Sequence, residues 1–318
     1  MGILTSQKIG LLYERFRDIE VIYSKEIIQV TGLQPRQIHI KCVSDAWPCV
    51  IYSSSFLGAK IAINVKSGFV SKLQQANNMV SLRFCFKDPF QEGELIAFFV
   101  AARSLGYVPY GDAKDVGLLT IQFTQRPPDD LIEIMGRLLD ANVNSTRRRG
   151  ERILVTAEIL RKLNIRSSEC AVFIQGVPRR CILRDISFGG VRIVIQGVVK
   201  FLLEKEASLR IDFEDPRESF LIKGKFIQAE NVAYRKDLAI INLAFDEGRI
   251  PMGYKMRLNG YLSTVRGAST EGESPVKAAP AEGDAPAAES PAPGLPGEAP
   301  AADAAVETAV KTAGGGMR

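Results

Sequence analysis

The stretch ILRDISFGGVRIVI, residues 182–195, has a near copy earlier in the chain, IYSSSFLGAKIAI at residues 51–63. A second pair follows in the same order, because SLRFCFKDP at 81–89 resembles SLRIDFEDP at 208–216. The spacing is similar in both pairs, at 132 and 127 residues. Two blocks repeated in one order predict that the body of the protein consists of two copies of one unit. The matched positions of the first pair are Ser53 with Asp185, Ser55 with Ser187, Phe56 with Phe188 and Gly58 with Gly190.

Each copy has the pattern of antiparallel β-strands. Leu209, Ile211 and Phe213 alternate with polar residues, and Phe220 and Ile222 do the same in the next segment. A period of two is typical of a strand with one buried face. Many short strands joined by turns predict a small barrel or sandwich. The expected fold class is therefore mainly β, with two tandem small antiparallel β-barrels.

Helices are expected beside these barrels. PPDDLIEIMGRLLDAN, residues 127–142, begins with two acidic residues and places Leu131 and Met135 on one apolar face, which indicates an amphipathic helix after the first barrel. PMGYKMRLNGYLSTV, residues 251–265, is expected to end the second copy in the same way. A further helix is expected near residues 6–18.

These elements divide the chain into four parts. We expect a first barrel over residues 1–140, an interdomain linker over 141–152, a second barrel over 153–266 and a disordered tail over 267–318. The linker is polar and charged and contains a glycine. The tail is rich in Ala, Pro, Gly and Glu and has few large apolar side chains, so it cannot bury enough surface to offset chain entropy.

The charge is unevenly distributed. The whole chain has a formal net charge of +5, whereas the tail from Gly267 holds eight acids and three bases, so the preceding 266 residues carry +10. A basic body favours an anionic partner such as a nucleotide, a nucleic acid or an acidic protein face. No apolar run reaches the ~18–20 residues of a membrane helix. The first residues lack a secretory signal, which predicts a cytoplasmic protein without a membrane span.

Catalytic residues are scarce. The five cysteines are odd in number and lack CxxC spacing, so reduced, buried thiols are expected rather than disulfides or a metal site. His39 is the only histidine, and its alternation with isoleucines predicts a solvent-facing strand position. A single histidine removes most Ser–His–Asp, Cys–His and His-based metal arrangements. We therefore expect no enzymatic activity, no metal and no cofactor.

Two short motifs in the second half carry recognisable chemistry. Arg148 and Arg152 form an RxxxR pair, with Arg147 and Arg149 beside them. Guanidinium groups donate paired hydrogen bonds to phosphate or to the O6/N7 edge of guanine and stack on flat rings. A basic cluster between domains is also often only a solvated linker, and the pair alone does not decide between these interpretations.

The second motif is DISFGG, with Asp185, Ser187, Gly189 and Gly190, between two predicted strands. Asp and Ser stabilise ordinary turns and Gly permits unusual dihedral angles, so a plain turn is one interpretation. The other is that a carboxylate and a hydroxyl face a base edge, while the two glycines let the backbone come close to a ligand.

RxxxR followed by D-x-S-x-x-G in a β-rich segment, over roughly residues 145–265, resembles the PilZ family of cyclic di-GMP receptors. The resemblance implies a six-stranded antiparallel barrel with a C-terminal helix. It implies that the arginines hold the phosphates and guanine faces, that the second motif reads a guanine edge, and that the residue preceding RxxxR affects whether one or two messengers bind. The residues expected to bind cyclic di-GMP are Arg147, Arg148, Arg152, Asp185, Ser187, Gly189 and Gly190.

The chain also departs from the family pattern. The spacing between the motifs is long, and ILRKLNIRSSE, residues 159–169, is interpreted as an insertion. The first copy has Ser53 in place of Asp185 and no preceding RxxxR pair, so it resembles a degenerate barrel that has lost the ligand. Two-domain PilZ receptors of the YcgR and PlzA type have such a non-binding N-terminal domain.

The function expected from this resemblance is that of a receptor. Cyclic di-GMP would change the interdomain arrangement and so regulate a protein partner in motility or virulence, for example the flagellar motor. Two alternatives stay open, a protein-interaction scaffold that binds no nucleotide and a nucleic-acid-binding pair of barrels.

Overall fold

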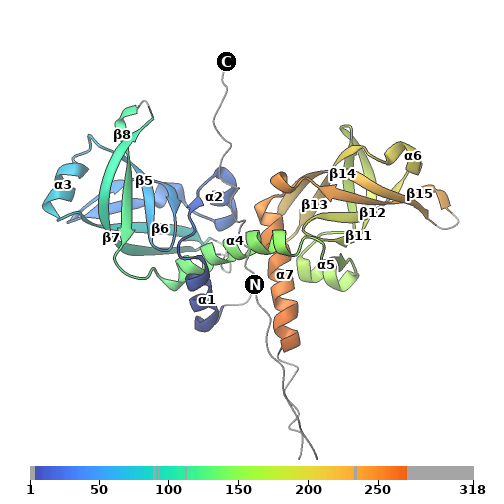
Figure 1. Cartoon of the computed structure of the whole chain (residues 1–318), viewed down its shortest axis with the longest axis horizontal. Coiled ribbons are helices and arrows are strands. Elements are labelled where there is room, and N and C mark those ends of the chain that lie inside the picture. The colour runs from blue at the N-terminus through green and yellow to red at the C-terminus, as the bar shows by residue number, and fades with distance from the viewer. Residues whose placement is uncertain (1–3, 89–90, 92, 112, 233–234, 271–318) are drawn as a thin grey trace, which may run out of the picture. The chain divides into compact units, whose positions relative to one another are not determined.

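The computed structural model describes residues 4–88, 91, 93–111, 113–232 and 235–270 (Figure 1). Two antiparallel sheets account for most of this part of the chain, with strand orders β1-β4-β5-β8-β7-β6-β2-β3 and β10-β13-β14-β15-β12-β11-β9. The mainly β fold with two tandem antiparallel units, each followed by a helix, is confirmed.

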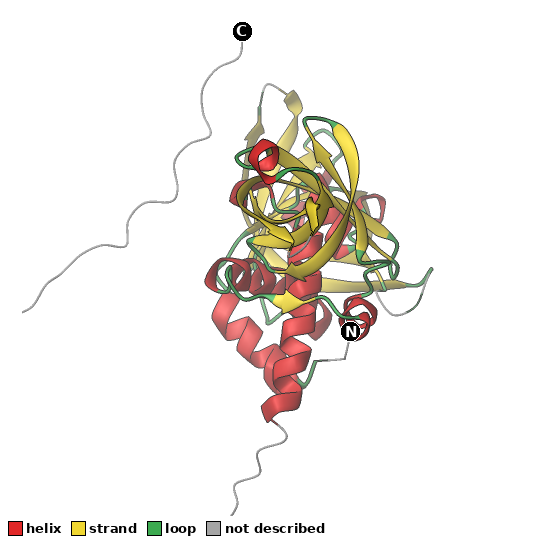
Figure 2. Ribbon diagram, turned by 90° about the vertical axis from the view of Figure 1, so that its right-hand side faces the viewer, coloured by secondary structure: helices red, strands yellow, loops and turns green. Residues whose placement is uncertain are grey.

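The second sheet closes into a barrel because β10 pairs with both β11 and β13. Six strands therefore form a ring, and the two-residue β9 adds to β11 at one end (Figure 2). The strands are β9 (Ile153–Leu154), β10 (Glu169–Ile174), β11 (Val177–Ile186), β12 (Gly190–Gln196), β13 (Glu206–Phe213), β14 (Glu218–Val232) and β15 (Arg235–Phe245).

The first sheet follows the same plan with one strand divided in two. β3 ends at Pro48 and β4 begins at Val50, so only Cys49 separates them, and together they correspond to β11. β3 pairs with β2 and β4 with β5, as β11 pairs with β10 and β12. The strands are β1 (Val21–Ile22), β2 (His39–Cys42), β3 (Asp45–Pro48), β4 (Val50–Ser54), β5 (Gly58–Asn64), β6 (Met79–Lys87), β7 (Leu95–Tyr110) and β8 (Ala113–Phe123).

The duplication extends to short helices that the sequence comparison missed. α2 (Lys25–Thr31) and α5 (Ala157–Leu163) occupy the same place in the two copies. Ser24 and Thr156 cap their N-termini, and both helices end at a residue with left-handed backbone. Residues 159–169 therefore include a helix that both copies share, and their interpretation as an insertion relative to the family pattern stays a prediction. The equivalence was hidden because the caps match in chemistry but the intervening letters do not.

Each copy buries its own apolar core. Ile40, Leu82 and Phe84 are buried in the first copy, and Leu209 and Ile211 in the second. Full burial of such a side chain stabilises the fold by about 1.5–3 kcal/mol. His39 lies in β2 next to the buried Ile38 and Ile40, so the alternation is confirmed, but its side chain is half-buried and less exposed than predicted. The five cysteines are free thiols, four of them buried.

The longer helices differ from expectation at their ends. α1 (Ser6–Phe16) lies where a helix was predicted. α4 (Asp129–Arg147) continues through most of the segment predicted as a linker, because Asn144 is buried and bonded to Asp140 and to Asn259 of α7. α7 (Met252–Thr270) extends four residues into the predicted tail, and residues 271–318 lie outside the described part. The remaining helices are α3 (Phe69–Gln75), α6 (Val199–Leu202) and the 3-10 turns η1 (Pro35–Gln37) and η2 (Glu247–Arg249).

Candidate functional site

The RxxxR segment connects α4 to the second barrel. Arg147 is the last residue of α4, and Arg148 follows as its C-cap, with its backbone N–H donating to the Asn144 carbonyl at 2.9 Å. Gly150 lies in the turn that follows, and Arg152 immediately precedes β9. The two arginines of the motif therefore come from different elements, a helix end and the approach to a strand.

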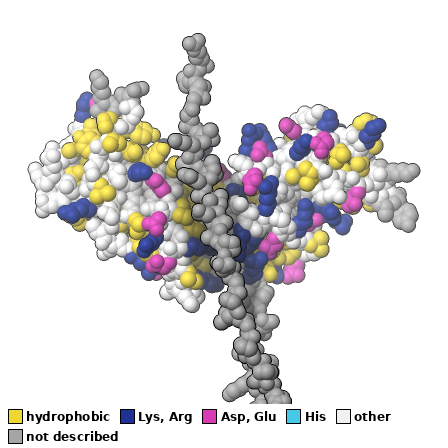
Figure 3. Space-filling view, viewed as in Figure 1, with side chains coloured by type: hydrophobic (Ala, Val, Ile, Leu, Met, Phe, Trp, Pro, Cys, Tyr) yellow, Lys and Arg dark blue, Asp and Glu magenta, His cyan; other side chains and the backbone are white. Residues whose placement is uncertain are grey.

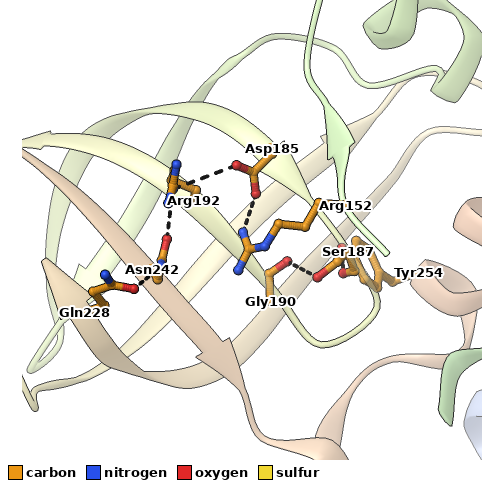
Figure 4. A network of polar contacts seen from close by, with 8 residues as sticks. All are labelled: Arg152, Asp185, Ser187, Gly190, Arg192, Gln228, Asn242 and Tyr254. Atoms are coloured by element: carbon orange, nitrogen blue, oxygen red, sulfur yellow. Dashed lines mark hydrogen bonds and ion pairs between the residues drawn. The ribbon is translucent and has the colours of Figure 1, made fainter. Parts of the chain in front are cut away.

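Arg152 and Asp185 form the central contact of the site (Figure 4). The Arg152 Nη1 donates to Asp185 Oδ1, and the Nε of Arg192 on β12 lies 4.0 Å from Oδ2 of the same carboxylate. Asp185 is 9% exposed and lies where the register of β11 shifts against β12. A nearly buried carboxylate is costly unless it is paired, so the two arginines make this position tenable.

Ser187 and Gly190 form the turn that follows β11. The backbone N–H and the Oγ of Ser187 both donate to the Gly190 carbonyl, each at 2.9 Å. The Ser187 carbonyl accepts a hydrogen bond of 2.8 Å from Tyr254 of α7. Ser187 is buried, and its hydroxyl serves the turn itself in this structure.

The two glycines of the turn each have a neighbour that a larger residue would meet. A Cβ on Gly190 would lie 2.4 Å from the Leu243 carbonyl oxygen of β15, and one on Gly189 would lie 2.5 Å from Arg149 Cγ. The Gly189 N–H also donates to the Arg149 carbonyl at 3.1 Å. Close packing within the protein thus explains both glycines. The closeness of their backbone to a ligand remains a prediction.

Sequence reasoning missed several residues beside the motif. Arg192 donates from Nε to Asn242 of β15 at 3.1 Å, and Asn242 donates to Gln228 of β14 at 2.9 Å (Figure 4). Arg149, noted only as a neighbour of the motif, pairs with Glu247 at 2.7 Å. Arg192 faces Asp185 within the β11–β12 hairpin, whereas Asn242 is 50 residues from Arg192 and is brought beside it by the pairing of β12 with β15.

Arg148 fits an incoming acceptor. Its Nη1 is buried and has no hydrogen-bond partner among the residues that the structure describes. A buried donor without an acceptor is costly and uncommon in native proteins. A phosphate oxygen or the O6/N7 edge of guanine would satisfy it.

The positive charge of the body is concentrated in the half that holds this site. Residues 141–266 contain 23 Lys and Arg against 14 Asp and Glu, whereas residues 1–140 contain 15 against 14. In Figure 3, Lys and Arg side chains are spread over the second barrel, while the visible face of the first shows more hydrophobic colour. The second barrel is therefore the part suited to an anion.

The first copy holds a contrasting cluster at the same place. Glu20 precedes β1 as Arg152 precedes β9, Ser53 takes the position of Asp185, and Lys60 that of Arg192. Ser53 donates to Glu20, and the Lys60 Nζ lies 2.9 Å from the same carboxylate. The hydrogen bond from Ser53, followed by that from Lys60, lowers the pKa of Glu20 below its usual value. An ionised carboxylate therefore stands where the second copy has an arginine.

The segment before β1 lacks a complete RxxxR pair. α1 ends at Phe16 with Arg17 as its C-cap, as α4 ends at Arg147 with Arg148 as its C-cap. Glu20 then stands where the second copy has Arg152, and the residue four positions before Glu20 is the buried Phe16.

Comparisons with known proteins identify the family of this chain. The model of the PilZN3 domain matches residues 7–142. A curated relative from Treponema denticola, named a cyclic di-GMP binding protein, is 42% identical over 274 residues, which cover 86% of this chain and 87% of the relative. The chain therefore belongs to the PilZ family.

Solved structures of related proteins give weaker likenesses. The PlzA protein of Borreliella burgdorferi in complex with c-di-GMP is 25% identical, with a TM-score of 0.37 over 81% of this chain and 99% of that one. YcgR from Escherichia coli in complex with c-di-GMP is 10% identical, with a TM-score of 0.27 over 82% and 97%. The family assignment rests on the domain match and the Treponema relative.

Two other features of the described residues bear on the site. None of their helices is long and apolar enough to cross a membrane. They also contain no group of three or more His, Cys, Asp or Glu side chains placed to hold a metal ion.

Proposed function

We propose that this chain is a receptor for cyclic di-GMP, which binds to the second barrel between the RxxxR segment and the D-x-S-x-x-G turn. One observation carries the proposal. The structure joins Arg152 to Asp185 across 33 positions of sequence and places the buried, unpartnered Nη1 of Arg148 on the same segment. The name of the Treponema relative supports the same ligand.

The chemistry of the messenger matches these side chains. Each guanine presents O6 and N7 acceptors on one edge and N1–H and N2–H donors on another, and the ring also carries two phosphates. Arg148 and Arg152 supply paired donors for a phosphate or for the O6/N7 edge. Asp185 supplies the acceptor for the N–H donors. Arg147 extends the basic segment at the end of α4.

Ligand binding exchanges one set of contacts for another. Asp185 and Arg152 satisfy each other in the ligand-free structure, so the messenger must replace that pair. Guanine N–H groups would take the place of Arg152 at the carboxylate, and Arg152 would turn to an acceptor of the ligand. Arg192, 4.0 Å from the other oxygen of Asp185, would continue to balance its charge.

The positions of the two arginines indicate how ligand binding would affect the rest of the protein. Arg148 terminates α4, the helix between the two copies, so a ligand that holds Arg148 and Arg152 together acts on the segment joining them. We propose that this changes the interdomain arrangement and thereby regulates a protein partner, in motility or virulence. The protein would act in the cytoplasm, where it binds the messenger without chemical turnover.

Isothermal titration of the full chain with cyclic di-GMP tests the proposal. Wild-type protein should bind, and Arg148→Ala/Arg152→Ala should lose about 100-fold or more in affinity, because each charge-assisted contact contributes roughly 1.5–3 kcal/mol. Arg161→Ala/Arg166→Ala removes the same charge elsewhere on the second barrel and should bind within a few fold of wild type. Absence of binding by wild type, or equal losses in both double variants, would contradict a specific site.

The charge of the second half also favours a second candidate, binding of nucleic acid. A protein that neutralises several phosphates loses affinity steeply as salt rises, with a slope near −0.9 per phosphate for duplex DNA. Titration of a DNA duplex at increasing salt distinguishes a nucleic-acid-binding protein from a cyclic di-GMP receptor. Tight, salt-sensitive DNA binding by a chain that ignores cyclic di-GMP would favour this alternative.

A further inference from the structure

A pocket of about 260 Å³ opens at an end of the second barrel, between the β10–β11 turn and α6. Val177, the first residue of β11, lines the pocket, whereas Asp185 lies near the other end of the same strand. The pocket is therefore separate from the proposed messenger site. Its lining includes Ile174, Val177, Arg179, Val198, Phe201 and Lys205.

The first barrel provides an internal comparison for this pocket. GFVSKL, residues 68–73, and GVVKFL, residues 197–202, connect equivalent strands. Each begins with a glycine of positive φ and ends with a leucine that is 4% exposed. Phe69 therefore corresponds to Val198, and Lys72 to Phe201.

The facing strands match in the same way. Trp47 pairs with Ile40 across β2 and β3, as Arg179 pairs with Val172 across β10 and β11. Two residues earlier, Asp45 corresponds to Val177. The two barrels thus present four pairs of equivalent positions around one end, which are Phe69 with Val198, Trp47 with Arg179, Lys72 with Phe201 and Asp45 with Val177.

In the first barrel these positions form a closed cap. Phe69 is 1% exposed and packs edge-on against Trp47, with ring centroids 5.3 Å apart. Lys72 and Asp45 form an ion pair of 3.4 Å beside them. The aromatic pair fills this end of the barrel, and its outer side is charged.

In the second barrel the two aromatic residues are replaced by smaller or charged ones, and the two charged residues are replaced by apolar ones. Valine replaces the buried phenylalanine and arginine replaces the tryptophan, so two rings are missing from the place where the pocket lies. The ion pair is replaced by Phe201 and Val177, which are 71% and 57% exposed. Contiguous exposed apolar surface with a polar rim is typical of interaction sites.

The rim of the pocket is basic. Arg179 and Lys205 line it, and Arg180 and Lys200 follow on the same two elements. None of the four makes an ion pair within the described part of the chain, whereas nearby Glu204 is already paired with Lys225. An incoming segment therefore meets an apolar hollow surrounded by cations without acidic partners.

We infer that this pocket is a docking site for an acidic segment of a protein partner that inserts one bulky apolar side chain. The inserted side chain takes the place that Phe69 and Trp47 fill in the first barrel, and the flanking carboxylates face Arg179, Lys200 and Lys205. Burial of one large anchor in a pocket is a common source of binding energy at protein interfaces. The inference goes beyond messenger binding and does not depend on it.

Fluorescence polarisation with labelled peptides tests the inference on the full chain. The probe has one tryptophan between two runs of three glutamates, and its matched control has alanine in place of the tryptophan. The chain should bind the tryptophan peptide roughly tenfold or more tightly than the alanine peptide, as expected for an anchor residue. Val198→Phe, which restores the filling residue of the first barrel, should abolish this preference without lowering Tm. Arg179→Gln/Lys205→Gln should weaken binding of both peptides.

Other outcomes would overturn the inference. Equal binding of the two peptides, or an unchanged preference in Val198→Phe, would mean that the pocket takes no anchor. Failure of the chain to bind either peptide would exclude an acidic segment of this kind. Binding to phosphatidylserine vesicles that is lost in Val198→Phe, without peptide binding, would identify the surface as one for lipid.

Discussion

Gly190 and Gly58 show at the residue scale how the barrel restricts side chains. A Cβ on Gly190 would lie 2.4 Å from the Leu243 carbonyl oxygen, and one on Gly58 would lie 2.3 Å from that of Ile121. The contact recurs in the copy whose site has lost its arginines, so strand packing alone requires this glycine. In the second copy this glycine, Gly190, is also part of the proposed ligand motif. It therefore has a structural role as well as the proposed binding role.

Gly190→Ala should lower the free energy of unfolding by about 1–3 kcal/mol, because the backbone of β12 or β15 must shift to admit the methyl group. Gly260→Ala is the control, since nothing lies within 4 Å of the added Cβ and alanine favours a helix interior by about 0.5–1 kcal/mol. Urea unfolding of both variants measures the difference. A Gly190→Ala change within about 0.5 kcal/mol of wild type would show that the strands adjust freely.

Glu20 should make stability depend on pH in acid. Its folded pKa lies below the usual value, so its ionised form stabilises the fold fully above the unfolded pKa of about 4.3. That contribution is lost as the pH falls through the folded pKa. Compared with wild type, Glu20→Gln should have a lower Tm above about pH 5, and the difference should narrow towards pH 3. Ser53→Ala removes the hydrogen bond that is the main cause of the lowered pKa of Glu20. It should therefore also reduce the pH-dependent stabilisation by Glu20. A Tm difference that stays constant from pH 3 to 7 would contradict this account.

At the scale of the element, α7 holds the motif turn in place. The buried Tyr254 hydroxyl donates to the Ser187 carbonyl, and Arg266 further along the helix pairs with Glu151 in the RxxxR segment. Both halves of the proposed site are thus attached to one helix. Burial raises the pKa of Tyr254 far above its usual value, so the hydroxyl remains a donor at any physiological pH.

Tyr254→Phe should test this attachment. It removes one buried hydrogen bond and leaves the Ser187 carbonyl without that donor, at an expected cost of about 1–3 kcal/mol in unfolding free energy. Affinity for cyclic di-GMP should fall by less than about tenfold, because no proposed ligand contact is deleted. Tyr261→Phe, on the same helix and only partly buried, is the control. A loss of binding as large as that of the arginine double variant would place Tyr254 in the site itself.

On the scale of the whole molecule, the sequence separates a folded body from an Ala/Pro-rich segment. Truncation after Thr270 removes residues 271–318 and should leave the Tm within about 2 °C of the full chain, because the removed segment has few apolar side chains to bury. Far-UV circular dichroism and thermal unfolding measure the effect. A marked fall in Tm would mean that this segment packs on the body, contrary to its composition.

The sequence by itself determined the β class, the duplication, the positions of α1, α4 and α7, and the motif residues. These follow from local patterns, because a period of two, an amphipathic face and a repeated block are all visible within short windows. The limits of α4 and α7 were misjudged, since polar residues such as Asn144 and Asn259 resemble a linker until their buried partnership is known.

Only the tertiary structure decided which distant residues meet. The pairing of β12 with β15 brings Asn242 beside Arg192, which is 50 residues away, and no local pattern encodes such a contact. It also showed that Glu20 stands in the first copy where the second has Arg152, because the equivalence runs through short elements with little sequence likeness. The contrast between the filled end of the first barrel and the open end of the second depends in the same way on packing across strands, which a linear sequence does not display.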